Sequence, residues 1–157
     1  MKMFGQTAIL FLVTGAGAGY FPWFPGTIGT LVAVPLSLGL NRLALTYFPF
    51  ALFTLVGSIL CAIWLSTKGA VILKQKDPRI IVIDEIVGFL VANFFAPPRL
   101  LALIWAFLLF RFFDITKPFP ADKLERLPGG SGIVLDDVMA GLYTLLSLRL
   151  LLELGWA

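Results

Sequence analysis

The sequence predicts an all-α fold, a compact membrane-embedded bundle of several helices with one polar face. Apolar residues make up 59% of the 157-residue chain and charged residues only 13%, against about 25% in ordinary soluble domains. No charged residue occurs between Arg42 and Lys68, and this gap can cross a bilayer, which takes about 20 apolar residues. Strand signals are weak, since "RIIVIDE" is β-branched but short. The mean hydropathy of +0.96 also favours a membrane-embedded protein. We expect one domain spanning residues 1–157.

The expected helices are apolar runs separated by turn residues. In chain order they cover residues 5–19, 28–40, 48–73, 84–96, 100–113, 119–126 and 135–153. The first follows Lys2, but "TGAGAGYFPWFPGT" has no small-residue cleavage site, so we expect no cleavable signal peptide. A rigid loop, "FPWFPGT", leads into the second helix, which should turn at Asn41–Arg42. Pro49 is tolerated in the first turn of the third.

Prolines and glycines delimit the later helices. Pro97 and Pro98 end the fourth, because two prolines cannot continue a helix. The fifth follows this turn at once. The "PGGSG" stretch at 128–132 should be a flexible loop ahead of the last helix.

Traced as antiparallel hairpins, these helices bring every unusual stretch to one face. That face receives the Pro-Gly loop, the basic stretch 68–79, the acids at 84–85 and the polar stretch 114–137. The opposite face receives short turns. Most Lys and Arg lie on the first face, so the positive-inside tendency makes it cytoplasmic. We expect a multi-pass protein with four or five spans.

Charge and cysteine content exclude other classes. The net charge of +3 comes from scattered basic residues without Arg/Lys runs, which argues against nucleic acid as a partner. The single cysteine, Cys61, lies in an apolar run and cannot form an internal disulfide. We interpret it as a packing residue.

The acids are few and lie at the edges of apolar segments. Asp84/Glu85 and Asp136/Asp137 are adjacent pairs at expected helix starts, where dipole and capping favour an acid. Capping explains one member of each pair, because neighbouring residues point about 100° apart. Asp114 lies near a helix C-terminus, where negative charge is disfavoured. Arg111, three residues earlier, can offset it as an ion pair.

Carboxylates gathered at one face repel each other, and a divalent cation would relieve this. Mg²⁺ suits an all-oxygen site and keeps substrate phosphate in its shell. Arg111 and Lys117 could bind phosphate oxygens. The "PGTIGT" loop, with Gly26 and Thr27, offers backbone N–H groups to an anion, although an ordinary helix start capped by Thr27 explains it equally well. These features predict metal-assisted phosphoryl chemistry on a lipid headgroup.

Absent motifs narrow the mechanism. The chain has no histidine, which excludes phosphohistidine chemistry and a His general base. It has no Cys-x5-Arg phosphate loop, no Asp-x-Asp pair and no Walker loop. A metal-bound water as nucleophile, with a free carboxylate as general base, is the option left.

Three blocks carry a family resemblance. They are "GYFPWFPGTIGTLVAVPL", "DPRIIVIDEIVGF" and "FRFFDITKPFPADKLERLPGGSGIVLDDVMAG". In order and spacing, from about Gly17 to Gly141, the chain resembles bacterial phosphatidylglycerophosphatase A. One departure is Arg79 and Ile80, where smaller or more polar residues are expected, and Arg79 could touch the headgroup.

The resemblance implies a Mg²⁺-dependent hydrolase that removes the terminal phosphate of phosphatidylglycerophosphate, leaving phosphatidylglycerol. It also implies a bacterial inner-membrane location and helices packed around a central one. The residues that match the family motifs are Asp84, Glu85, Asp114, Asp136, Asp137, Lys117 and the Pro25–Thr27 loop. Our own assignment makes all five acids catalytic, with metal ligands at positions 84, 85, 114 and 137, and adds Arg111 to the phosphate contacts.

Two alternatives remain open at this stage. A cation-binding or transport protein would also keep acids within the membrane, but transport sites usually lie near the midplane. In a helical scaffold the acids would only cap helices.

Overall fold

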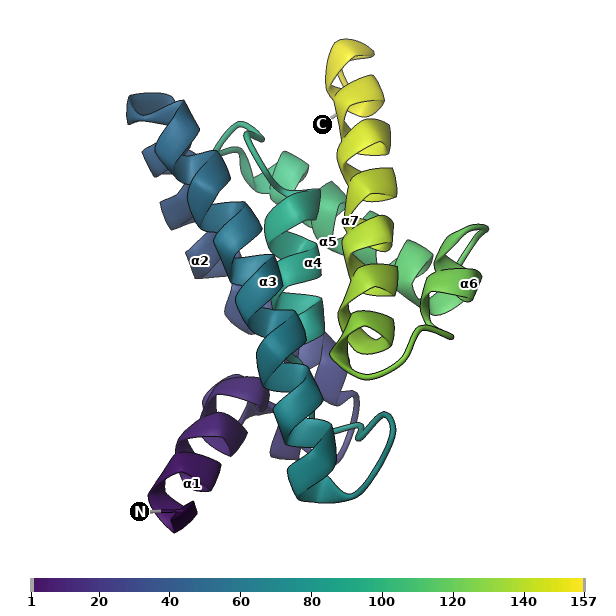
Figure 1. Ribbon diagram of the computed structural model, residues 1–157. Helices are drawn as coiled ribbons and strands as arrows, with labels where there is room; N and C mark the ends of the chain where they lie inside the picture. Colours follow the sequence, from purple (N-terminus) through teal and green to yellow (C-terminus); the bar gives the residue numbers. More distant parts are fainter. Residues whose placement is uncertain (1, 157) are drawn as a thin grey trace.

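The computed structural model describes residues 2–156, and this part of the chain contains helices and turns but no strand. The all-α prediction is therefore confirmed. The elements in chain order are α1 (Lys2–Val13), the 3₁₀ turn η1 (Ala18–Tyr20), α2 (Pro25–Thr46), α3 (Phe48–Leu73), α4 (Ile83–Ala92), α5 (Leu100–Thr116), α6 (Ala121–Leu124) and α7 (Gly130–Glu153). Figure 1 shows their arrangement, with the start of α4 and the start of α7 both directed toward the lower half of the view.

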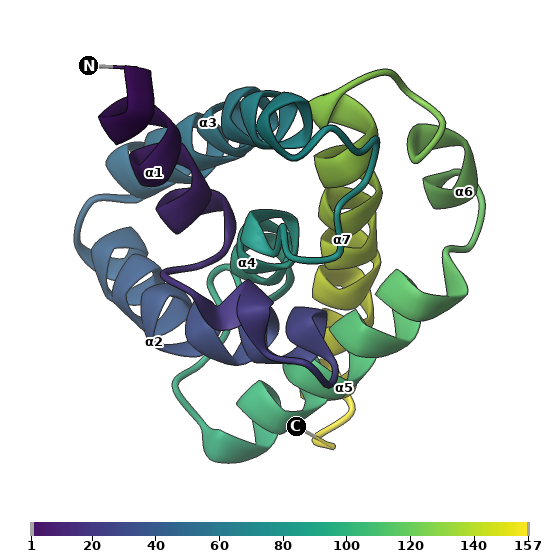
Figure 2. The ribbon, with the colours of Figure 1, turned by 90° about the horizontal axis from the view of Figure 1, so that it is seen from below.

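Helix α4 is the centre of the bundle. It is only ten residues long, and all of them except Ile83 and Glu85 are buried. Seen from below, α4 is enclosed by α2, α3, α5 and α7 (Figure 2). A short helix that is apolar on every side needs neighbours on every side, so its composition explains its position. The central helix implied by the family resemblance is present.

Two glycines let α4 and α7 cross at close range. A Cβ atom on Gly88 would lie 2.8 Å from the carbonyl oxygen of Asp137, and a Cβ on Gly141 would collide with the carbonyl oxygen of Gly88. Small residues at a crossing allow the two backbones to touch. Asp84 precedes Gly88 by about one helical turn, and Asp137 precedes Gly141 by the same spacing. The crossing therefore brings these two acids together.

Two of the expected helix boundaries are wrong in ways that affect the site. Helix α2 begins at Pro25, three residues before the expected start, and it continues through Asn41–Arg42 to Thr46. The predicted turn fails because the Asn41 side chain is buried against the end of α4, where it donates to the carbonyl oxygens of Asn93 at 2.8 Å and Ala96 at 3.3 Å. Only Tyr47 separates α2 from α3.

The glycine-rich stretch 128–132 is the second error, because it is part of a helix start and not a flexible loop. Gly129 is the N-cap of α7, with φ at 65°. A Cβ on Gly130 would collide with the carbonyl oxygen of Ile63 in α3. The Gly130 N–H also donates to Thr67 Oγ1 at 2.9 Å. Helix α7 thus starts five residues earlier than expected, packed against α3.

The other differences are smaller. Helix α1 ends at Val13 and not at residue 19, because Gly15, Ala16 and Gly17 have positive φ. Helix α4 ends four residues early, at Ala92, and α5 runs three residues further than expected, to Thr116. Of the segment 119–126, only Ala121–Leu124 is α-helical.

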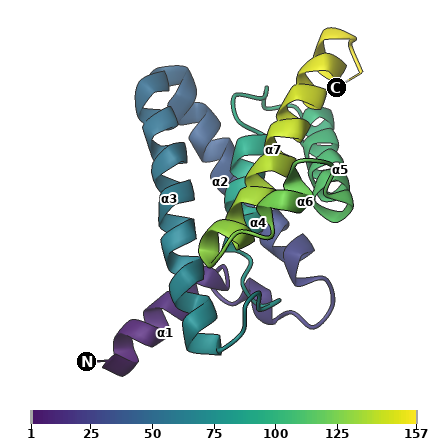
Figure 3. The same ribbon diagram turned by 45° about the vertical axis from the view of Figure 1, so that its right-hand side comes forward.

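Two helices, α2 and α3, are long and apolar enough to cross a membrane by length and composition. Only 22% of the apolar window of α3 is buried, whereas the core helix of a soluble protein is mostly buried. Large apolar side chains such as Phe53, Leu45 and Leu100 are each more than 70% exposed. Figure 3 shows the end of α3 and the start of α4 at the same end of the bundle as α1.

Candidate active site

A cavity of about 210 Å³ at this end of the bundle collects the predicted acids. It is lined by Pro25, Asp77, Arg79, Ile81, Asp84, Glu85, Asp114, Lys117, Ile133, Asp136 and Asp137. All five acids predicted from the sequence line it, although they come from three helices. The convergence of distant acids on one site is therefore observed.

Three of the acids have the spacing of a cation site. One carboxylate oxygen from each of Asp84, Glu85 and Asp137 can be chosen so that all three lie within 4.8 Å of one another. Asp84 and Glu85 stand in the first turn of α4, and Asp137 reaches them from α7. Asp84 Oδ1 and Glu85 Oε2 are buried and have no hydrogen-bond partner. Buried, unpaired carboxylate oxygens are costly unless something else satisfies them.

Burial makes these acids hold protons more tightly. Desolvation raises the pKa of Asp84 well above its ordinary value, and the charges of Glu85 and Asp137 raise it further. Desolvation also raises the pKa of Asp137, helped by the charges of Asp114 and Glu85. These groups lie outside the two helices that could span a membrane. A divalent cation would replace the bound protons and make the ionised form favourable.

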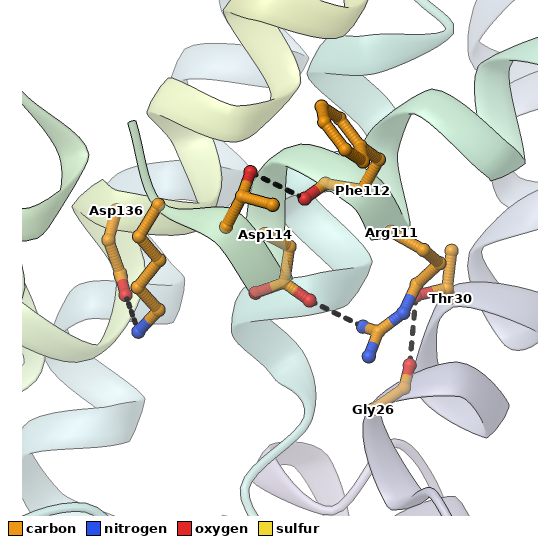
Figure 4. A network of polar contacts seen from close by, with 8 residues as sticks. Gly26, Thr30, Arg111, Phe112, Asp114 and Asp136 are labelled. Carbon is orange, nitrogen blue, oxygen red and sulfur yellow. Dashed lines mark hydrogen bonds and ion pairs between the residues drawn. The ribbon is translucent and has the colours of Figure 1, made fainter. Parts of the chain in front are cut away.

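The ion pair predicted between Arg111 and Asp114 is present in the last turns of α5. Arg111 Nη1 lies 2.6 Å from Asp114 Oδ2, and Figure 4 shows the two side chains facing each other. Gly26 packs directly behind them, since a Cβ there would collide with Glu85 Oε1 and lie 3.1 Å from Arg111 Nη1. Arg111 thus holds Asp114 and closes the site against the start of α2.

Lys117 is engaged by two acids. Its Nζ lies 2.8 Å from Asp136 Oδ2 and 3.1 Å from Glu125 Oε2. Burial alone would lower the pKa of Lys117, but hydrogen bonds and charge from Asp136 and Glu125 outweigh it and raise the pKa. Lys117 ends α5 in the left-handed region, with φ at 42°. The other oxygen of Asp136, Oδ1, is buried without a hydrogen-bond partner.

The start of α2 supplies backbone donors beside the acids. Phe24 is the N-cap, so Thr27 lies inside the first turn and does not cap the helix. Among the described residues no carbonyl accepts from the N–H groups of Gly26 or Thr27, as expected in a first turn. Thr30 Oγ1 donates to the Gly26 carbonyl at 2.8 Å (Figure 4). Thr27 itself is half-buried and does not line the cavity.

Sequence reasoning missed one acid of the cavity, Asp77, whereas it had placed Arg79 as a possible contact of the headgroup, and Arg79 does line the cavity. Both belong to the "KDPR" turn between α3 and α4. An acid before proline is an ordinary turn residue, so its local pattern carries no signal. The apolar walls Ile81 and Ile133 were also missed, because they resemble core residues.

Helix capping does not account for the acids. The N-cap of α4 is Val82, with no capping side chain. Asp136 and Asp137 lie in the second turn of α7, beyond the free N–H groups, and both are buried. Capping hydrogen bonds therefore do not explain these acids, although Asp84 and Glu85 do stand in the first turn of α4.

Comparison with known proteins identifies the family. A family model described as phosphatidylglycerophosphatase A matches residues 11–152. The chain is 33% identical to phosphatidylglycerophosphatase A of Escherichia coli, covering 83% of this chain and 75% of that protein. It is 37% identical to phosphatidylglycerophosphatase A of Haemophilus influenzae, covering 86% and 83%.

A third relative carries a different name. A Bacteroides thetaiotaomicron protein, named provisionally as a phosphatidylinositol-3-phosphatase, is 38% identical over 83% of this chain and 85% of its own. No solved structure matches the chain. The family match covers most of the residues from α1 to α7, including every acid of the cavity, and the chain belongs to the phosphatidylglycerophosphatase A family.

Proposed function

We propose that the protein hydrolyses the terminal phosphate of phosphatidylglycerophosphate, releasing phosphatidylglycerol and inorganic phosphate, with Mg²⁺ as its cofactor. The family match supports the phosphatase reaction. The proposal of a Mg²⁺ cofactor rests on the trio Asp84, Glu85 and Asp137. One carboxylate oxygen from each lies within 4.8 Å of the other two. None of the ion pairs in the described residues involves this trio.

The donor set fits Mg²⁺. All donors are carboxylate oxygens, which a hard cation prefers, and two of them are buried without partners. Asp84, Glu85 and Asp137 would hold the ion, and Asp114, fixed beside them by Arg111 at 2.6 Å, is a fourth candidate. When bound, Mg²⁺ would neutralise phosphate charge and activate water for attack on phosphorus.

The other side chains of the cavity have roles that follow from their contacts. Asp136 is outside the trio, is oriented by Lys117 through Oδ2 and keeps Oδ1 free. It is therefore the best candidate for the general base that takes a proton from water. Lys117 has three N–H donors and gives two of them to acids. The third donor would bind a phosphate oxygen. The free N–H groups of Gly26 and Thr27 are further candidates beside the cavity, which this turn itself lines through Pro25.

The protein would work at the bacterial inner membrane, as a multi-pass chain with the acid cavity at the cytoplasmic face. Two apolar helices support a membrane location. Lys68, Lys74, Lys76 and Arg79 cluster around the end of α3, near the cavity. Basic residues of this kind favour the cytoplasmic side.

The test is phosphate release from phosphatidylglycerophosphate in mixed micelles by the purified protein. We expect Mg²⁺-dependent activity that falls at least a hundredfold in Asp137→Asn. Glu153→Gln, the same change at an exposed site near the end of α7, is the matched control and should keep full activity. Full activity in excess EDTA would contradict the cofactor. Activity restricted to soluble phosphomonoesters would contradict the lipid substrate.

A cation transporter is the competing function. The acids gather at the ends of helices, around one cavity, and transport sites usually lie at the midplane between broken helices. The depth of the acids in the membrane can be measured by placing single cysteines at positions 84 and 137 and labelling them with membrane-impermeant reagents. Rapid labelling from the aqueous phase agrees with a surface enzyme, and protection at midplane depth would favour transport.

A further inference from the structure

A second, larger hollow adjoins the acid cavity. It has a volume of about 700 Å³ and runs along the turn between η1 and α2, with Arg79 and Ile80 on its other side. Pro25 and Arg79 line both hollows. A molecule bound at the acids can therefore continue past Arg79 into this groove, which we call the aromatic groove.

The aromatic groove presents rings to its surroundings. Tyr20, Phe21, Trp23 and Phe24 line it and are 60%, 50%, 74% and 76% exposed. Aromatic side chains with this exposure are typical of the zone between lipid headgroups and acyl chains. They offer apolar faces to the glycerol backbone and first methylenes of a lipid.

The groove is held in shape by backbone packing. A Cβ on Gly19 would collide with the carbonyl oxygen of Ile80, so the aromatic turn lies directly on the segment that carries Arg79. The Val82 N–H donates to the Val13 carbonyl at 2.9 Å and ties the same segment to the end of α1. Both walls are thus fixed relative to each other.

Among the residues that the structure describes, Arg79 is the one cation that lines both hollows. It is exposed, and none of the ion pairs or side-chain hydrogen bonds of the described residues involves it. Arg111 and Lys117, in contrast, each form an ion pair with an acid. A free guanidinium between an acidic centre and an apolar groove fits an anionic group that lies between the two.

We propose that Arg79 binds the inner phosphodiester of the lipid while the aromatic groove receives its glycerol backbone. This rests on the proposed function, which places the terminal phosphate at the acids. The recognised class is a phospholipid whose headgroup carries a phosphomonoester beyond the diester that joins it to diacylglycerol. Phosphatidate, whose single phosphate sits directly on diacylglycerol, lacks the diester and gains nothing from Arg79.

The kinetic test compares Arg79→Gln with the wild type on two lipids in the same micelles. On phosphatidylglycerophosphate the variant should raise KM by on the order of tenfold to a hundredfold with little change in kcat, the size expected for a charge-assisted hydrogen bond. On phosphatidate its KM should not change. Arg79→Lys should recover part of the loss, and Lys68→Gln, which removes an exposed basic residue of α3, is the matched control.

A phosphoinositide 3-phosphate in a third arm shares the inner diester, so its KM should rise in Arg79→Gln as well. The ratio of the two wild-type rates then identifies the headgroup. Equal effects of Arg79→Gln on diester lipids and phosphatidate, or no effect on either, would overturn the assignment.

A binding readout separates this inference from the proposed function. Trp23 lies in the groove, so phosphatidylglycerol, which has the diester but no terminal phosphate, should shift its fluorescence relative to micelles of a detergent that contains no phosphate. Trp23→Phe identifies that signal among the four tryptophans of the chain. Arg79→Gln should abolish the shift even if the wild type hydrolyses no lipid. An unchanged shift in Arg79→Gln would reject the subsite while leaving the phosphatase intact.

Discussion

Replacing Gly88 by alanine tests the helix crossing on which the acid site depends. The new Cβ would lie 2.8 Å from the carbonyl oxygen of Asp137 and 2.9 Å from two ring atoms of Phe110. The Phe110 side chain is fully buried, and the carbonyl belongs to the α7 backbone, so neither can move aside by a rotamer change. Helix α7 must shift away from α4, and Asp137 must shift with it.

The expected change in folding stability of Gly88→Ala is the sum of two opposing contributions. Forcing a methyl group into a packed interface costs about 1–3 kcal/mol. The upper half of this range is expected here, because the methyl group would clash with a backbone carbonyl oxygen, which cannot rotate away. Alanine in place of glycine inside a helix returns about 1 kcal/mol. Gly57 in α3 is the control, because a Cβ there meets nothing within 4 Å. Gly57→Ala should be stabilised by about 1 kcal/mol and Gly88→Ala destabilised by about 1–2 kcal/mol.

Thermal unfolding in detergent measures the difference. For a chain of this length a gap of about 2–3 kcal/mol separates the two melting temperatures by roughly 5–10 °C. Activity should respond more strongly, because a misplacement of about 1 Å at a catalytic centre can cost on the order of a hundredfold in rate. If Gly88→Ala melts and turns over like Gly57→Ala, α4 and α7 do not meet as described and the acid trio has no structural basis.

Three further outcomes are expected. Asn41→Leu leaves the backbone groups at the end of α4 without a partner, so it should lower the free energy of unfolding by about 2–4 kcal/mol. The kcat of the folded protein should stay unchanged, and a large loss of kcat would contradict this structural role. Lys117→Met removes the cation that pairs with the buried Asp136 and should lower kcat/KM at least tenfold. Adding Asp136→Asn should restore the melting temperature but not the rate. If the double variant recovered both, Asp136 would have no role in catalysis. Mg²⁺ should bind more tightly as pH rises and should release protons, because Asp84 and Asp137 have raised pKa values and must lose their protons first. In EDTA the folded state binds more protons than the unfolded one, so the melting temperature should fall as pH rises from about 4; calorimetry in two buffers that finds no proton release would contradict the raised pKa values.

The sequence was sufficient for features that depend on spacing along one helix. The Arg111–Asp114 pair follows from its i,i+3 separation, and it is present at 2.6 Å. The meeting of the five acids follows from helix lengths and turns, because antiparallel helices return the chain to the same end. The contact between Lys117 and Asp136 joins residues 19 positions apart, and no local pattern predicts it.

The errors in the fold have a common physical cause. Asn41 is a turn residue by composition, but hydrogen bonds to α4 and Phe95, whose N–H donates to its Oδ1 at 2.7 Å, keep it in a helix. The glycines at 129 and 130 suggest flexibility, but close approach to Ile63 of α3 makes them necessary for packing. In each case a long-range contact overrides the local preference, and the sequence does not show which distant residue makes it.

The charges of the site divide into two groups, and this division supports the proposed metal site. Asp114 and Asp136 each have a cation from the chain, Arg111 and Lys117, at 2.6 and 2.8 Å. Asp84, Glu85 and Asp137 have none within the described residues, although Asp84 and Asp137 are buried as well. If the role of the acids were structural, the unpaired trio would be the part most readily replaced by apolar residues, because buried charge without a partner destabilises a fold. The pairing of two acids and the grouping of the other three support the proposal that a divalent cation supplies the missing positive charge.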